Sequence, residues 1–131
     1  MLVVDTSAAL DALVGAGDRS GELRERLVGD GDLHAPHLLD VEAASALRRM
    51  ARRGELTDAR ASDALGDLRD LHLHRYPHEP LLERIWELRD NLTAYDATFV
   101  CLAEILDAPL LTRDRRLASS PGHQATIELI G

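Results

Sequence analysis

The chain has 131 residues, 45% apolar and 29% charged, enough to bury one hydrophobic core, so we expect a single domain over residues 1–131. Its net charge of −8 argues against a protein that coats nucleic acid, and the lack of lysine excludes any mechanism needing a catalytic lysine. The single cysteine, Cys101, excludes an internal disulfide, and we find neither a secretory signal pattern nor a membrane-spanning apolar stretch of about 18 residues. These features predict a cytoplasmic protein.

Short apolar runs alternate with longer amphipathic ones, which is the pattern of parallel strands joined by helices. In chain order we expect a strand over 2–4, helices over 8–14 and 22–28, a strand over 33–35, helices over 38–53 and 57–71, a strand over 72–76, helices over 79–89 and 93–106, a strand over 110–112, a short helix over 115–118 and a strand over 125–130. Leu82, Ile85 and Trp86 are expected to face the core. The order predicts a three-layer α/β fold with a short, mainly parallel central sheet.

Four acidic residues fall near junctions between predicted strands and helices. Asp5, Asp96 and Asp114 stand where a strand or loop leads into a helix, and Glu42 lies early in a helix. The carboxyl ends of parallel strands open on one edge of a sheet, so these side chains can converge. Two carboxylates about 4 Å apart repel by roughly 4 kcal/mol at an effective dielectric of 20, which raises their pKa unless a cation offsets it. The pattern therefore predicts a Mg²⁺ or Mn²⁺ site suited to phosphodiester cleavage.

Each acid taken alone also has a simpler interpretation. Asp5 and Asp114 could cap the helices that follow them, and Asp96 stands three residues after Thr93, as in a capping box. Glu42 could be a solvated side chain in a first helical turn. Two acids that directly follow buried strands on one edge are harder to explain by capping alone, which favours the metal site.

Segments around these acids resemble a known family. They are Val3-Val4-Asp5-Thr6-Ser7-Ala8, Ala35-Pro36-His37-Leu38, Glu42-Ala43-Ala44-Ser45-Ala46-Leu47-Arg48, Tyr95-Asp96-Ala97 and Leu111-Thr112-Arg113-Asp114. In order and spacing, over essentially the whole chain, they resemble the PIN-domain ribonucleases of the VapC toxin family. One departure is that Arg115 and Arg116 follow Asp114 where some relatives have a further acid, which leaves open a second metal ion.

The resemblance implies a function and a set of roles. Asp5, Glu42, Asp96 and Asp114 would form the catalytic metal site, with Asp5 and Asp96 as direct Mg²⁺ ligands. Ser7 and Thr112 would support it through their hydroxyl groups. The activity implied is Mg²⁺-dependent endonucleolytic cleavage of RNA by an activated water, as the toxin of a type II toxin–antitoxin system. The partners implied are the RNA substrate, a small VapB-like antitoxin that inserts a segment into the acidic pocket, and a second copy in a homodimer.

Arginines near the acids are candidates for RNA contact. Arg49 and Arg53 fall within about 40° of Glu42 on a helical wheel, and Arg113, Arg115 and Arg116 flank Asp114. They could bind RNA phosphates, or they could form an ordinary solvated basic surface.

Other residues give weaker signals. His72 and His74 would lie on one strand face as a possible metal pair, but no third ligand is close in the sequence, and Cys101 is expected to be an inert buried thiol. A receiver-type phosphoacceptor would need a lysine, and an aspartate-nucleophile phosphatase a second Asp where Ser7 stands. An alternative of a different class is a catalytically silent PIN module that binds RNA or a protein partner.

Overall fold

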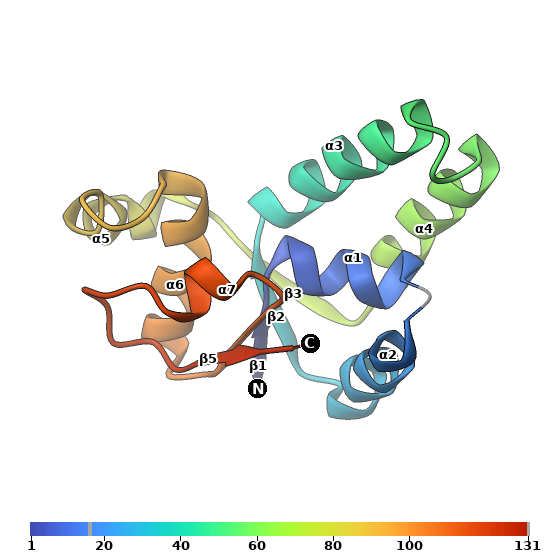
Figure 1. Ribbon diagram of the computed structural model, residues 1–131. Helices are drawn as coiled ribbons and strands as arrows, with labels where there is room; N and C mark the ends of the chain where they lie inside the picture. The colour runs from blue at the N-terminus through green and yellow to red at the C-terminus, as the bar shows by residue number, and fades with distance from the viewer. Residues whose placement is uncertain (16, 131) are drawn as a thin grey trace.

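The central element is a parallel β-sheet. The computed structural model describes residues 1–15 and 17–130 (Figure 1). Within these residues the strands are β1 (Leu2–Val4), β2 (Leu33–Pro36), β3 (Leu73–Tyr76), β4 (Leu110–Thr112) and β5 (Ile127–Leu129). They form one sheet in the order β3-β2-β1-β4-β5, and every neighbouring pair is parallel. The prediction of a short, mainly parallel sheet is confirmed.

Helices cover both faces of this sheet. They are α1 (Thr6–Val14), α2 (Asp18–Asp30), α3 (Leu38–Arg52), α4 (Asp58–Asp70), the 3-10 turn η1 (Glu79–Leu81), α5 (Leu82–Glu87), α6 (Ala94–Leu106) and α7 (Arg115–Ala118). Helix α6 packs on β1, β2 and β4, and α5 packs on α6. Helix α1 contacts α2, α3 and α4 on the other side, so Figure 1 shows the sheet between α5 and α6 on the left and α1 to α4 on the right.

The core is centred on β1 and the two elements beside it. Leu2, Val3 and Val4 are no more than 2% exposed, because β1 lies in the middle of the sheet with helices on both faces. Seven consecutive residues of α6, from 97 to 103, are buried. A helix that is apolar on all sides is typical of one enclosed between a sheet and another helix.

The segment over 79–89 differs from the prediction. It divides into η1 and α5, and Leu82 and Trp86 are 56% and 67% exposed, so their predicted inward orientation is wrong. Ile85 is buried as predicted. The reason is helical spacing: Leu81, Ile85 and Leu88 are four and three residues apart and share the face that packs inward. The Trp86 ring instead lies under the Arg89 guanidinium, 4.6 Å from its centroid.

Two further expectations concern single features. Cys101 is buried in α6, and burial raises the pKa of its thiol to about 11, which agrees with an inert side chain. No helix in the described part of the chain has the length and apolar character needed to cross a membrane.

Candidate active site

The four predicted acids come from elements that meet at the carboxyl ends of β1, β2 and β4. Asp5 directly follows β1, and Asp114 lies two residues after β4. Glu42 is in α3, the helix that follows β2, and Asp96 is in the first turn of α6. Since β1 lies between β2 and β4 and all are parallel, their carboxyl ends open on one edge.

These carboxyl groups lie within electrostatic range of one another. Burial, followed by the charge of Asp96, raises the pKa of Asp5, which is 6% exposed. Burial, and then the charges of Asp96 and Asp5, raise the pKa of Glu42. Burial and the charge of Asp114 raise the pKa of Asp96. We call this group of Asp5, Glu42, Asp96 and Asp114 the acidic cup.

Asp5 is held in one orientation by three hydrogen bonds. Ser7 Oγ and the Ala8 backbone N–H donate to Asp5 Oδ1, at 2.6 and 2.9 Å. The Thr112 hydroxyl donates to Asp5 Oδ2. The carboxylate thus caps α1 and also faces the cup, so the capping interpretation and the metal-site interpretation of Asp5 are compatible.

The same two hydroxyl groups fasten the loop after β4. Ser7 Oγ accepts the Arg113 backbone N–H at 3.0 Å, and Thr112 Oγ1 accepts the Asp114 backbone N–H at 3.0 Å. Asp114 Oδ1 in turn accepts the backbone N–H groups of Arg116 and Leu117 and caps α7. Ser7 and Thr112 therefore fix the position of Asp114 relative to Asp5.

One side chain that positions an acid of the cup was not identified from the sequence. Thr6 Oγ1 donates to Glu42 Oε1 at 2.7 Å, across 36 residues. Thr6 stands within the Asp-Thr-Ser-Ala segment, which was a signal, but only the fold reveals its partner. Thr93 caps α6 as expected, because its Oγ1 accepts the Asp96 backbone N–H at 3.2 Å.

The donor set fits a hard divalent cation. Three carboxyl groups of the acidic cup have a raised pKa through burial and mutual repulsion, which is the condition that a bound cation would relieve. Arg116 offsets this only in part, by lowering the pKa of Asp96. Carboxylate and hydroxyl oxygens are ligands that Mg²⁺ and Mn²⁺ prefer.

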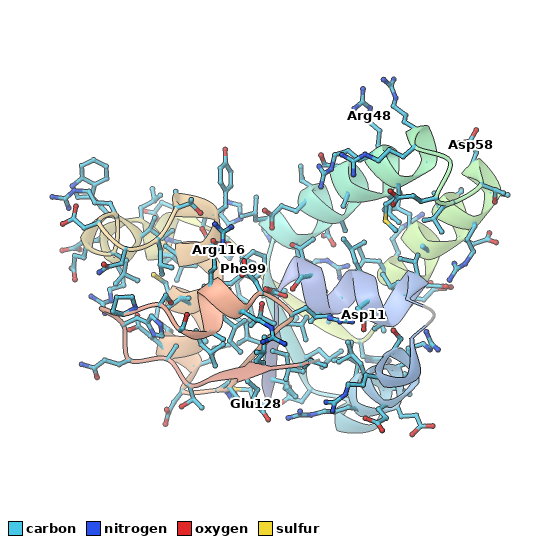
Figure 2. All side chains as sticks on the ribbon, viewed as in Figure 1. Asp11, Arg48, Asp58, Phe99, Arg116 and Glu128 are labelled. Carbon is cyan, nitrogen blue, oxygen red and sulfur yellow. The ribbon has the colours of Figure 1, made fainter. Side chains whose placement is uncertain are left out.

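The candidate RNA-contact arginines differ in their surroundings. Arg116, labelled in Figure 2, lines a cavity of about 240 Å³ together with Asp96 and Asp114. Arg113 pairs with Asp11 at 2.7 Å, which directs its charge toward α1. Arg49, Arg53 and Arg115 are exposed, and Arg49 donates to Ser45 Oγ at 3.1 Å. Arg116 is therefore the candidate that lies against the acidic cup.

Comparison with known proteins decides the family. The family model "PIN domain" matches residues 2–121. The chain is 47% identical over 129 residues to the ribonuclease VapC1 of Mycobacterium tuberculosis, covering 98% of this chain and 96% of that protein. The chain belongs to the VapC family of PIN-domain ribonucleases. VapC ribonucleases are the toxins of VapBC toxin–antitoxin systems, and PIN ribonucleases are typically metal-dependent.

Solved structures agree with this membership. The crystal structure of PAE2754 from Pyrobaculum aerophilum is 27% identical and superposes with a TM-score of 0.75, over 96% of this chain and 81% of that one. VapBC2 of Rickettsia felis, solved bound to a DNA fragment from its promoter, contains a chain that is 13% identical with a TM-score of 0.73, over 99% and 98%. This VapC family member therefore has the PIN fold.

Proposed function

We propose that this VapC family ribonuclease cleaves RNA endonucleolytically with a Mg²⁺ ion in the acidic cup, for which Mn²⁺ could substitute. The observation that carries the proposal is the raised pKa of Asp5, Glu42 and Asp96, caused by burial and by the charges of other acids of the cup, with Asp114 acting on Asp96. When bound, the ion would supply a Lewis acid that polarises a phosphate oxygen and makes water a stronger nucleophile.

The side chains in and around the acidic cup would have different roles in the reaction. Asp5 and Asp96 are the proposed direct ligands, and Asp114 adds negative charge opposite Asp96. Ser7 and Thr112 orient Asp5, since their hydroxyl groups donate to its two oxygens. Glu42 has one oxygen, Oε1, engaged by Thr6, and its other oxygen would accept a proton from the attacking water.

RNA must bind despite the repulsion between its phosphates and a chain with a net charge of −8. Arg116 is the proposed first phosphate contact because it lines the cavity beside Asp96 and Asp114. Arg49, Arg53 and Arg115 would extend the contact along exposed surface, and Arg113 would contribute only if its pair with Asp11 opens. The proposed substrate is cytoplasmic RNA held locally by a few phosphates, with no general nucleic-acid surface.

Partner proteins follow from the family and from the charge of the site. We propose a small cognate VapB-like antitoxin that places a cationic side chain, such as an arginine, in the acidic cup. A cationic side chain would offset the repulsion that contributes to the raised pKa of three carboxyl groups of the cup, so the charges favour its binding. We also propose that two copies of the chain form a homodimer.

The proposal is tested with purified protein and a labelled RNA. We expect Mg²⁺-dependent cleavage by the unaltered chain, a loss on the order of a thousandfold in Asp5→Asn and Asp96→Asn, and retained RNA binding. Asp63→Asn, an exposed acid on α4 outside the cup, is the matched control and should cleave normally. Full activity in Asp5→Asn would refute its role. Binding without cleavage by the unaltered chain would support the alternative, a catalytically silent PIN module.

A further inference from the structure

A second cluster of metal-binding side chains lies outside the acidic cup. Asp32 immediately precedes β2, His34 is the second residue of β2, and His74 is the second residue of β3. In these neighbouring parallel strands His34 and His74 are directly paired in register. The cluster is therefore near the amino ends of the strands, whereas the acidic cup is at their carboxyl ends.

The three side chains direct one atom each toward a common point. Asp32 Oδ1 lies 2.8 Å from His34 Nε2 and 3.7 Å from His74 Nε2, and the three ligand atoms all lie within 4.8 Å of one another. A tetrahedral zinc site with bonds of about 2.0–2.1 Å separates its ligand atoms by roughly 3.3 Å, so a small adjustment of these side chains would suffice. His74 can make that adjustment because its side chain is 64% exposed.

The surroundings of His34 match those of a metal-binding histidine. The ring is buried and stacks on His74, with centroids 4.8 Å apart and planes 19° apart, so both rings present Nε2 to the same carboxylate oxygen. The Nδ1 atom of His34 contacts the Tyr76 hydroxyl at 2.5 Å. A ligating histidine characteristically has its second ring nitrogen held by such a partner.

Each ring nitrogen of His34 has a polar partner that is compatible with metal binding. Nε2 of His34 lies 2.8 Å from Asp32 Oδ1, and Nδ1 lies 2.5 Å from the Tyr76 hydroxyl oxygen. With Nε2 as the metal ligand, a neutral ring carries its proton on Nδ1, which can donate to the Tyr76 oxygen while the Tyr76 hydroxyl proton turns away from the ring. The second oxygen of Asp32, Oδ2, lies 3.4 Å from the Met1 amino nitrogen, which leaves Oδ1 turned toward the two rings.

We infer that Asp32, His34 and His74 form a second, Zn²⁺-selective metal site that links β2 to the edge strand β3 and is separate from the acidic cup. Two imidazoles and one carboxylate favour Zn²⁺ over Mg²⁺, and the exposed side leaves a fourth position for water. The inferred site differs from the His72 and His74 pair considered in the sequence: His72 lies outside β3, and His74 is paired in register with His34 of the neighbouring strand.

The test titrates the metal-free full chain with Zn²⁺ by calorimetry, and with Co²⁺ while recording its visible absorption. His74→Ala should weaken binding at this site by at least about a hundredfold, and Tyr76→Phe by about 10–100-fold. His72→Ala is the matched control, because it removes an exposed histidine two residues away, and it should bind like the unaltered chain. A rise in Tm with Zn²⁺ should follow the same order.

Two results would overturn the inference. One is Zn²⁺ binding by His74→Ala with unchanged stoichiometry and affinity. The other is the lack of any difference between His74→Ala and His72→Ala in the Co²⁺ spectrum. Both variants keep the acidic cup intact, so metal bound there contributes equally to each, and loss of RNA cleavage in another variant would not affect the comparison.

Discussion

The Thr112 hydroxyl donates a hydrogen bond to Asp5 Oδ2 from a position 107 residues further along the chain. Thr112 ends β4 and Asp5 follows β1, so the bond joins the ends of two paired strands. The same Thr112 oxygen accepts the Asp114 backbone N–H. One fully buried hydroxyl group thus sets the relative positions of two of the four acids.

Thr112→Val should reduce cleavage while preserving the fold. Valine has nearly the same shape but leaves Asp5 Oδ2 and the Asp114 N–H without this partner, which should cost about 1–3 kcal/mol of unfolding free energy. We expect kcat/KM to fall by about 10–100-fold, as for other residues that orient a metal ligand. The measurements are RNA cleavage and urea unfolding. Thr126→Val, at an exposed threonine beside β5, is the control. Equal kinetics in both variants would contradict the role of Thr112.

Thr6→Val should change the pH dependence of cleavage. The Thr6 hydroxyl lowers the pKa of Glu42 against the opposing effect of burial, so removing it should raise that pKa further. The acid limb of the kcat/KM profile should then move to higher pH, with a loss of about tenfold on that limb. Thr6→Ser retains the hydroxyl and should restore the profile. An unshifted limb in Thr6→Val would show that Glu42 does not titrate in the reaction.

Metal-free protein should be destabilised by ionisation of Asp5. Because the folded-state pKa of Asp5 is raised, its contribution to stability is fully present below the unfolded pKa of about 3.9 and is lost as pH rises through the folded pKa. In EDTA the Tm of Asp5→Asn minus that of the unaltered chain should therefore increase as pH rises from about 4. Comparison with this variant cancels the opposite contributions of Asp32 and Glu104, whose pKa values are lowered.

Adding Mg²⁺ at neutral pH should reverse that difference. The ion offsets the repulsion in the unaltered chain and should raise its Tm, whereas Asp5→Asn has lost one of the proposed ligands and should respond weakly. Differential scanning calorimetry at several pH values measures both effects. A Tm difference that stays constant with pH, or an equal Mg²⁺ response, would argue against a repulsive acidic cup.

Truncation of two neighbouring residues of α5 should lower the free energy of unfolding by very different amounts. Ile85 is buried, and α5 packs on α6, so Ile85→Ala should lower the free energy of unfolding by about 2–5 kcal/mol. Trp86 is 67% exposed and contacts Arg89, so Trp86→Ala should cost less than about 1 kcal/mol. Chemical unfolding measures both. A large loss in the Trp86 variant, at protein concentrations where it is monomeric, would place this side chain in the core after all.

Features that depend on local pattern could be predicted from the sequence. A buried strand such as Leu2–Val4 is a continuous apolar run, and Thr57 and Thr93 cap the helices that follow them, as their positions indicate. Acids at junctions that lead into helices also predict that Asp5 and Asp96 lie near one another. Their roles as metal ligands remain a prediction.

Features that depend on strand register or on helix rotation could not be predicted. The contact of Thr6 with Glu42 and the pairing of His34 with His74 join residues 36 and 40 positions apart, and nothing in either local segment specifies the partner. Trp86 was predicted to share one inward helical face with Leu82 and Ile85, whereas the spacing of Leu81, Ile85 and Leu88 fixes that face. Helix α2 begins at Asp18, four residues before the predicted start, because its first turn is polar.

The central position of β1 makes the acidic cup depend on segments from opposite ends of the domain. Strand β1 pairs with β2 on one side, and its other neighbour, β4, lies at residues 110–112. Until β4 pairs with β1, Asp5 lacks the Thr112 hydroxyl and the acidic cup lacks Asp114. Assembly of the proposed metal site therefore requires that the sheet has formed between segments more than 100 residues apart.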